Sequence, residues 1–551
     1  MTATLLGLLI GAAGLLPTTP AHGQYFGRNK VLWETFDFEI LDTEHFSIYH
    51  YPPRSAAVDD VARLSERWYT RLSSAFGHEF EHRNPLIIYA DHSDFQQTLT
   101  TSGLIGEGTG GFTESLQNRV VLPLTGVNAD NDHVLGHELV HAFQFDRLEH
   151  LDRAQGESAP QLPLWMTEGL AEYLSQGRHD AHTALWLRDA VLFDMLPDPE
   201  NMSRLALSPY RYGQAVWAYL GGRFGDRIAL QLFDVASRIG LAAAVRQELD
   251  VEPEALLADF HASLRDAYGP VIDSRLEAHE IARLLGHRQA GSARLNIGPS
   301  LSPDGTKLAF MSSIELFTTD LYLADVASGE ILTKLVSEET DPHYDYLSFI
   351  DSSVAWSPDG HYLAFTVFAR GDRRIVLYDV ERRRIDRELP LAGVKGVSDP
   401  AWSPDGRYLA FSAIVDGQSD LYRVDVATST VTRLTADGYT AIQPTFAPDG
   451  KSLVFVTDLG PQTDLATLSF GPLQLARLDL VTLAIERLPI FPSGKHIDPH
   501  FTPDGRGLLF IGEPDGVPDV FRYDLETRAV TRLTALKTGV AGITASSPAL
   551  T

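Results

Sequence analysis

The sequence predicts a multidomain protein in which a mixed α+β domain is followed by an all-β propeller of five to six blades. Three observations support this prediction. The chain has 551 residues, more than one ordinary hydrophobic core organises. Short strand patterns and then helical patterns fill its first half. After about residue 293 a strand-rich unit recurs with a period of roughly 45 to 55 residues, which is typical of propeller blades.

Composition narrows the class of protein. Hydrophobic residues make up 44% of the chain and aromatic residues 10%, as expected of a globular protein with a real core. The net charge of −28 argues against a nucleic-acid partner, because polyphosphate would be repelled. The chain has no cysteine, so any metal ion must be held by histidines and carboxylates.

Residues 1–23 have the pattern of a signal peptide. Leu5 to Leu16 is an apolar core, and small residues precede the expected cleavage before Gln24. No Lys or Arg precedes that core, which leaves a buried N-terminal helix or a misplaced start codon as alternatives. No apolar stretch reaches the roughly 18 residues that span a bilayer. We therefore expect an exported protein, periplasmic or secreted, with no transmembrane segment in the mature chain.

Residues 24–285 have the mixed pattern of the first domain. Helical spacing predicts a helix over Ala56 to Phe76 and an almost wholly helical region from Asp130 to about Ala267. Alternating or continuous apolar segments predict strands at Phe36–Leu41, Phe46–Tyr51, Pro85–Tyr89 and Arg119–Pro123.

Residues 286–551 contain the repeats. Ser-Pro-Asp-Gly or a near copy ends at Gly305, Gly360, Gly406, Gly450 and Gly505. Proline sets φ in this turn, aspartate caps it and glycine accepts positive φ. An apolar strand follows each turn, so five full blades are expected. Ser547 to Thr551 resembles the start of a sixth blade, which either closes the ring or continues beyond residue 551.

The repeats resemble those of TolB-type propellers and cover nearly half the chain. From the architecture, with the propeller stacked against the first domain, we expect a module that binds a protein partner or limits access to that domain. Four histidines fall in the expected propeller loops, where surface polar roles are the ordinary expectation: His343, His361, His496 and His500.

The segment around His137, Glu138 and His141 has the pattern H-E-x-x-H. On a helix, residues four apart lie on one face, so the two imidazoles can bind one zinc ion while Glu138 handles a water proton. The structural alternative is two histidines on a buried helix face beside an exposed glutamate.

The segment Leu164 to Tyr173 resembles the second zinc-binding helix of the gluzincin metallopeptidases, within the peptidase MA clan. The resemblance implies a zincin-like domain with Glu168 as the third zinc ligand and Glu172 as the carboxylate that orients a ligand imidazole, that of His137. Both roles suit a catalytic zinc site. The alternative is a solvated pair of glutamates. Glu168 follows His141 by more residues than in better-known relatives, which implies an inserted loop over roughly residues 148–163.

The segment Pro209 to Gly213 resembles a gluzincin aminopeptidase helix, one residue short, whose tyrosine donates to the oxyanion. This implies Tyr210 in that role, with Tyr212 as the alternative. An edge strand that pairs with substrate is expected at Gly110–Thr113 or Arg119–Leu122. His133 is expected to pack or hydrogen-bond beside the site. No segment resembles the anchor for a substrate amino terminus, so aminopeptidase specificity is not implied.

These patterns predict a zinc metallopeptidase that acts on peptides or proteins, with Glu138 as general base. The competing hypothesis is a non-catalytic envelope protein that binds a partner through its propeller. The sequence leaves open the substrate, endo- or exopeptidase action and the oligomeric state.

Overall fold

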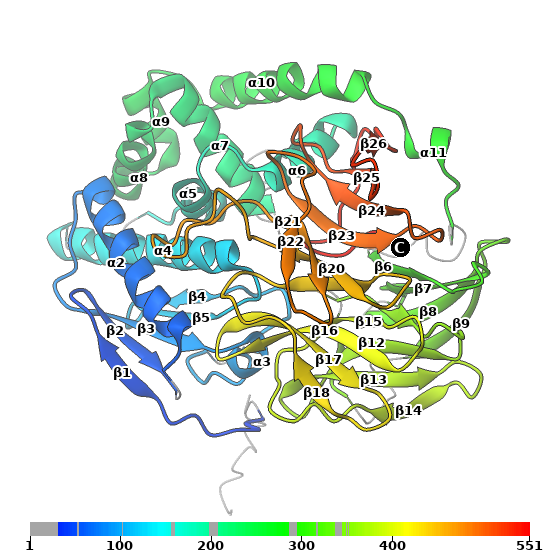
Figure 1. Ribbon diagram of the computed structural model, residues 1–551. Helices are drawn as coiled ribbons and strands as arrows, with labels where there is room; N and C mark the ends of the chain where they lie inside the picture. Colours follow the sequence, from blue (N-terminus) through cyan, green and yellow to red (C-terminus); the bar gives the residue numbers. More distant parts are fainter. Residues whose placement is uncertain are drawn as a thin grey trace, which may run out of the picture.

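The structure is a computed structural model that describes residues 31–51, 54–101, 103–155, 160–197, 208–285, 295–315, 318–336, 344–348, 350 and 352–551. The predicted signal peptide, residues 1–23, and His343 lie outside the described residues. The chain is multidomain: a largely helical N-terminal domain packs against a five-bladed β-propeller (Figure 1).

The N-terminal domain contains a five-stranded sheet in the order β1-β2-β3-β5-β4. Its inner pairs are parallel and its two outer pairs are antiparallel. The strands are β1 (Glu39–Asp42), β2 (Phe46–His50), β3 (Asn84–Tyr89), β4 (Phe112–Glu114) and β5 (Arg119–Pro123). Strand β5 lies inside the sheet, so the expectation of a free edge at Arg119–Leu122 is wrong; β4 lies at the edge.

The first predicted strand begins three residues later than expected. Phe36 and Phe38 are not in β1; their rings pack against Tyr51 and Tyr89, with the Phe36 and Tyr89 centroids 5.7 Å apart. Residues two apart lie on the same face of an extended segment, so both rings reach this cluster, but pairing with β2 begins only at Glu39, opposite His50.

The described helices are as follows: α2 (Ala56–Phe76), α3 (His92–Phe95), α4 (Asn128–Gln155), α5 (Leu164–Gln176), α6 (Ala181–Leu192), α7 (Ser208–Phe224), α8 (Arg227–Ile239), α9 (Leu241–Leu249), α10 (Pro253–Asp273) and α11 (Ala278–Ile281). Helix α4 continues to Gln155, so the loop predicted over residues 148–163 is partly helical. No described helix combines the length and apolarity needed to cross a membrane.

Helix α4 packs closely on α2 at the centre of the domain. Leu135, Leu139 and Phe143 are fully buried in the same cluster as Trp68 of α2. A Cβ on Gly136 would lie 2.5 Å from the Trp68 ring, so only glycine fits there. Trp68 Nε1 also donates to Asp132 at 2.7 Å. These contacts hold α4 against α2 beside the H-E-x-x-H segment.

The propeller consists of five blades with antiparallel strands. Blade one contains β6 (Asn296–Leu301), β7 (Lys307–Ser312), β8 (Asp320–Asp325) and β9 (Ile331–Val336); blade two contains β10 (Tyr346–Leu347), β11 (Ala355–Trp356), β12 (Tyr362–Ala369), β13 (Asp372–Asp379) and β14 (Arg384–Glu388); blade three contains β15 (Ser398–Trp402), β16 (Tyr408–Val415), β17 (Gln418–Asp425) and β18 (Val431–Arg433); blade four contains β19 (Ile442–Phe446), β20 (Ser452–Thr457), β21 (Gln474–Asp479) and β22 (Ile485–Arg487); blade five contains β23 (His496–Phe501), β24 (Gly507–Gly512), β25 (Asp519–Asp524) and β26 (Val530–Arg532).

The repeated turn has the same construction in four blades, shown by the copy in blade three; blade four has Ala447 in place of the hydroxyl residue, and its Asp449 accepts from the Lys451 amide. Asp405 accepts from Ser403 Oγ at 2.6 Å and from the Arg407 amide at 3.1 Å, while Gly406 has φ 70°. The aspartate thus satisfies donors of its own turn, and glycine adopts the left-handed conformation at no steric cost.

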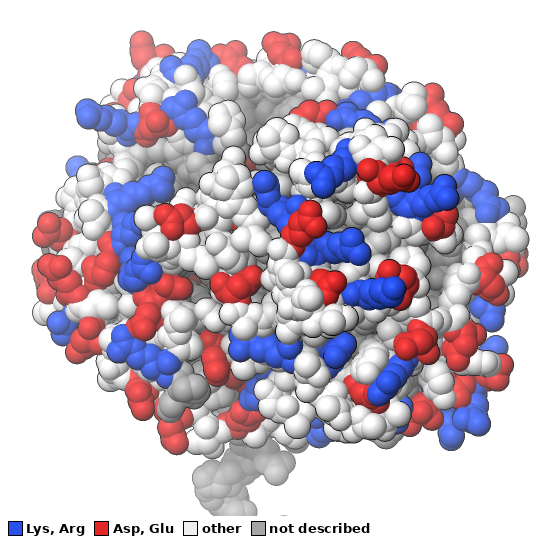
Figure 2. Space-filling model, viewed as in Figure 1, with Lys and Arg blue, Asp and Glu red and all other residues white. Residues whose placement is uncertain are grey.

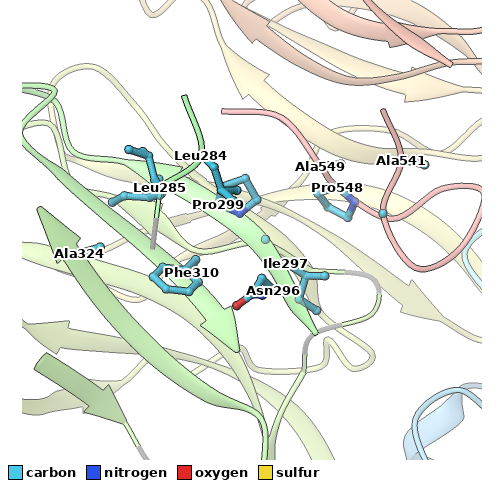
Figure 3. A pocket seen from close by; sticks show the side chains of 13 residues that line it. Leu284, Leu285, Asn296, Ile297, Pro299, Phe310, Ala324, Ala541, Pro548 and Ala549 are labelled. Atoms are coloured by element: carbon cyan, nitrogen blue, oxygen red, sulfur yellow. The ribbon is translucent and has the colours of Figure 1, made fainter. Parts of the chain in front are cut away.

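The described residues of the propeller form five sheets and no sixth blade. Apolar clusters join each blade to the next from one to five. Between blades five and one lie the last residues instead: the Ala549 and Leu550 amides donate to Asp498, and the Leu301 amide donates to Thr551 Oγ1. An apolar pocket remains beside this segment, with Phe310 of blade one on one side and Pro548 on the other (Figure 3).

The N-terminal domain is bound to one face of the propeller by buried polar contacts. Arg275 donates to Asp519 at 2.7 Å, and both side chains are buried. Ser419 donates to the Gly126 carbonyl at 2.6 Å. Acidic and basic side chains mix over both units on the face seen in Figure 2, so the negative charge is not gathered into one patch there.

The propeller histidines differ in exposure. The His361 side chain is exposed and that of His500 is half-buried. His496 is fully buried, with its ring centroid 5.3 Å from Phe491 and 5.5 Å from Phe510. His496 and His500 both lie on β23, the innermost strand of blade five, so the prediction that they fall in loops is wrong. The expectation of a surface role is also wrong for His496, which is buried inside the blade.

Candidate metal centre

Helices α4 and α5 bring three donor atoms to one point. His137 Nε2 and His141 Nε2 are 3.2 Å apart, and Glu168 Oε2 lies 3.3 Å from the first and 3.0 Å from the second. Ligands held at about 2.0–2.1 Å in a tetrahedron around zinc are separated by about 3.3 Å. The three predicted metal ligands therefore have the separations that a tetrahedral metal ion requires.

A close crossing of α5 and α7 sets the position of Glu168. A Cβ on Gly169 would lie 2.3 Å from the Gly213 carbonyl carbon, and a Cβ on Gly213 would lie 2.3 Å from the Trp165 carbonyl oxygen. Only paired glycines allow the two helices to approach this closely. The crossing places Tyr210, one turn before Gly213, beside the donor atoms.

Each imidazole has an orienting partner on its other nitrogen. Glu172 Oε1 lies 3.0 Å from His137 Nδ1, as the resemblance implied. Gln144 Oε1 lies 2.9 Å from His141 Nδ1, and Gln144 Nε2 donates to the Thr167 carbonyl at 3.1 Å. We did not anticipate Gln144; its spacing of three residues from His141 on a helix was the available signal. Such partners fix the tautomer and ring orientation of ligand histidines.

Glu172 also connects the site to its surroundings. His133 Nε2 lies 3.4 Å from Glu172 Oε1, so this histidine is beside the site as expected. Arg211 Nη1 lies 3.4 Å from both Glu172 Oε2 and Asp180 Oδ2. Arg211 therefore links the second α5 carboxylate to the segment before α6, an interaction for which the sequence carried no signal.

The donor cluster has an electrostatic preference for positive charge. Burial opposes ionisation of Glu168, but the imidazoles of His137 and His141 outweigh it and lower its pKa to about 2. Burial likewise opposes a charge on His137, yet Glu168 and Glu172 raise its pKa to about 10. Burial is also outweighed at Glu172, whose pKa is held well below its usual value by His133 and His137. Buried carboxylates beside imidazoles suit a bound cation.

Glu138 lies next to the donor cluster and is held by the sheet. Thr113 Oγ1 is 2.8 Å from Glu138 Oε2 and 2.9 Å from the Glu138 carbonyl oxygen. Thr113 belongs to the edge strand β4, and a Cβ on neighbouring Gly111 would lie 3.3 Å from Glu138 Cγ. The glutamate is thus positioned between the edge strand and the metal ligands. The contact with Thr113 was not anticipated.

The two candidate tyrosines point to different environments. The Tyr210 ring lies 5.9 Å from the His137 ring at 26°, and burial together with Glu168 raises the pKa of its hydroxyl. It therefore remains a protonated donor. Tyr212 is buried in the hydrophobic core, where burial and Asp189 raise its pKa to about 12. Of the two, the structure brings only Tyr210 to the site.

These residues line a cavity of about 650 Å³. Gly108 to Thr113 form one wall, and side chains of α4, α5 and α7 form the others. All of its lining residues belong to the N-terminal domain. The arrangement provides three metal donors, a nearby carboxylate, a phenolic donor and an edge strand around one open space, which is the set required for metal-assisted hydrolysis.

Comparison with known proteins supports the propeller. Residues 349–480 match the TolB beta propeller domain family, so the C-terminal half carries a TolB-type propeller. No curated protein matches the chain in sequence.

Solved structures are similar over part of the chain. TolB from Acinetobacter baumannii is 22% identical over 52% of this chain and 60% of its own, with a TM-score of 0.33. A putative TolB from Agrobacterium tumefaciens is 22% identical over 43% and 80%, with a TM-score of 0.36. A puromycin-hydrolyzing peptidase from Mycobacterium tuberculosis is 19% identical over 44% and 38%, with a TM-score of 0.33. The present chain thus spans about 60% of the length of the Acinetobacter protein.

Proposed function

We propose that the N-terminal domain is a zinc metallopeptidase of the gluzincin type. The observation that carries the proposal is the convergence of His137 Nε2, His141 Nε2 and Glu168 Oε2 at separations of 3.0–3.3 Å beside Glu138. The two imidazoles and one carboxylate suit zinc and leave a coordination position toward the cavity.

His137, His141 and Glu168 would hold the metal ion, while Glu172 and Gln144 keep the two imidazoles in their ligand orientation. A bound zinc ion supplies Lewis acidity and lowers the pKa of water. Glu138, positioned by Thr113, accepts the proton of the attacking water and delivers it to the leaving amine. Tyr210 donates its hydroxyl hydrogen to the oxygen on which charge develops.

The edge strand β4 provides a natural place for an extended peptide. It pairs with β5 on one side, and its residues Phe112 and Thr113 line the cavity. An antiparallel peptide added at this edge would pass in front of Glu138, which Thr113 contacts. Backbone pairing of this kind suits a peptide or protein substrate and requires no anchor for a free amino terminus.

In this proposal the propeller binds a protein partner. Its family match and its firm attachment to the N-terminal domain support this role. Ser348 of the propeller donates to Glu107, next to the cavity wall that begins at Gly108. This contact supports binding of a partner or limitation of access to the cavity as the contribution of the propeller. Export to the periplasm or beyond is part of the proposal and rests on the pattern of residues 1–23.

The alternative is a non-catalytic envelope protein with a structural metal site. The position of Glu138 disfavours it, because a purely structural site requires no base beside an open coordination position. Zinc content and hydrolysis of a broad peptide library, measured for wild type and Glu138→Gln, separate the two. The proposal expects zinc in both proteins and cleavage by wild type alone. Zinc binding without cleavage by either protein favours the alternative.

A further inference from the structure

We propose that His78, Asp146 and His150, with Glu81, form a second zinc site that is closed and structural. The three central residues are able to place one donor atom each within 4.8 Å of one another. None of them takes part in the peptidase site proposed above. The inference therefore stands independently of that function.

The cluster joins two segments that are distant in sequence. His78 follows the left-handed Gly77 that ends α2, and its amide donates to the Ser73 carbonyl. Asp146 and His150 lie on α4. His78 Nε2 is in hydrogen-bond contact with Asp146 Oδ2, and the two imidazole centroids are 4.9 Å apart. A metal ion here would fasten the loop after α2 to the C-terminal half of α4.

Helix α4 thus presents two donor pairs with the same spacing. Asp146 and His150 are four residues apart, as are His137 and His141. At about 100° per residue, the second pair lies about 180° around the helix from the first. The two clusters consequently lie on opposite faces of α4, and an ion bound at one has no direct access to the other.

The hydrogen bonds of His150 prepare one nitrogen as a ligand. His150 Nδ1 lies 2.8 Å from the Asp146 carbonyl oxygen, which accepts only from a protonated nitrogen. This contact leaves a lone pair on Nε2, which lies 3.3 Å from Glu81 Oε1. An outer hydrogen bond that selects the tautomer is a common feature of metal-binding histidines.

The donor set and its surroundings indicate a structural ion. Two imidazoles and two carboxylates satisfy tetrahedral zinc with no open position. The His78 and Asp146 side chains are 9% and 19% exposed, whereas His150 and Glu81 are 33% and 64% exposed, so the ion enters from the surface. None of these four residues lines the cavity beside Glu138.

Zinc stoichiometry of the full chain tests the inference. After removal of metal, reloading with zinc sulfate and removal of the excess, wild type is expected to retain two equivalents by mass spectrometry. His78→Ala/His150→Ala should retain one equivalent and keep its peptide hydrolysis. His141→Ala should also retain one, and the combined variant none.

Asp146→Asn provides a variant of unchanged size in case the alanine variants fail to fold, and it should likewise retain one equivalent. Zinc should raise the melting temperature of His141→Ala but not that of the combined variant. One equivalent in wild type, lost in His141→Ala and kept in Asp146→Asn, would show that the cluster is only an ion pair. Two equivalents in both wild type and Asp146→Asn would also overturn the assignment.

Discussion

Charged side chains in the repeated turns of the propeller and in the metal cavity of the N-terminal domain have opposite roles. In the propeller, an aspartate recurs in each turn and satisfies donors of that same turn, as Asp405 does for Ser403 and Arg407. In the N-terminal domain, charged residues from separate helices converge on one cavity, and none of them satisfies its own local backbone. A charged residue that recurs in every blade and bonds to its own turn has a structural role. Charged residues that meet at one cavity without bonding to their own backbone indicate a functional site.

The largest expected effect is at Glu138. Glu138→Gln preserves the shape of the side chain but removes the base, so peptide hydrolysis should fall by about 10²- to 10⁴-fold. Zinc content should not change, because the three ligands remain. Glu149→Gln, an exposed glutamate on the same helix, is the matched control and should hydrolyse like wild type. Equal rates of hydrolysis for the two variants would contradict a catalytic role for Glu138.

Tyr210 and Tyr212 form a natural pair for the second test. Tyr210→Phe removes the only phenolic donor among the described residues that line the cavity, and kcat should fall by about 10²- to 10³-fold with KM little changed. Tyr212→Phe lies in the core and should retain its kcat. Steady-state kinetics on one cleaved peptide would measure both. A larger loss of kcat in Tyr212→Phe than in Tyr210→Phe would mean that Tyr212, and not Tyr210, is the donor to the oxyanion.

The helix crossing gives the third test. Gly169→Ala places a Cβ against the Gly213 backbone, and the free energy of unfolding should fall by about 1–3 kcal/mol. Gly222→Ala on α7 meets no atom within 4 Å, so it should be neutral or stabilising by up to about 1 kcal/mol. Chemical denaturation followed by circular dichroism measures both. Equal stability of the two variants would mean that α5 and α7 are not in close contact.

The smallest effect is expected at a propeller turn. Asp405→Ala loses two accepted hydrogen bonds, which should lower the stability of the propeller by about 0.5–1.5 kcal/mol. Hydrolysis should be unaffected, in contrast to Glu138→Gln. The exposed Asp386 provides the control, and Asp386→Ala should melt like wild type. A loss of hydrolysis in folded Asp405→Ala would contradict a purely structural role for the aspartates of the propeller turns.

The features that could be predicted from the sequence depend on residues that are close together along the chain. The Pro-Asp-Gly turns predicted the propeller, and the helix over Ala56 to Phe76 has the predicted bounds. The i, i+4 spacing predicted that His137 and His141 face the same side. The positions of Glu168 and Glu172 relative to them came from a family resemblance, because spacing alone does not relate two separate helices.

The rest depended on contacts between distant segments. The hydrogen bonds from Gln144 to Thr167 and from Thr113 to Glu138 form because one face of α4 packs on α5 and another packs on β4. The burial of His496 follows from packing inside blade five. Similarly, Ser547 to Thr551 would start a sheet only if further strands lay beside it. The pattern of five residues does not show whether such strands exist.

Anomalous scattering from crystals of the zinc-loaded full chain, measured at the zinc absorption edge, tests the central claim most directly. We expect a peak bounded by His137 Nε2, His141 Nε2 and Glu168 Oε2, with Glu138 beside it and outside bonding distance. The absence of a peak between these three atoms in zinc-loaded crystals would contradict the proposed metal centre.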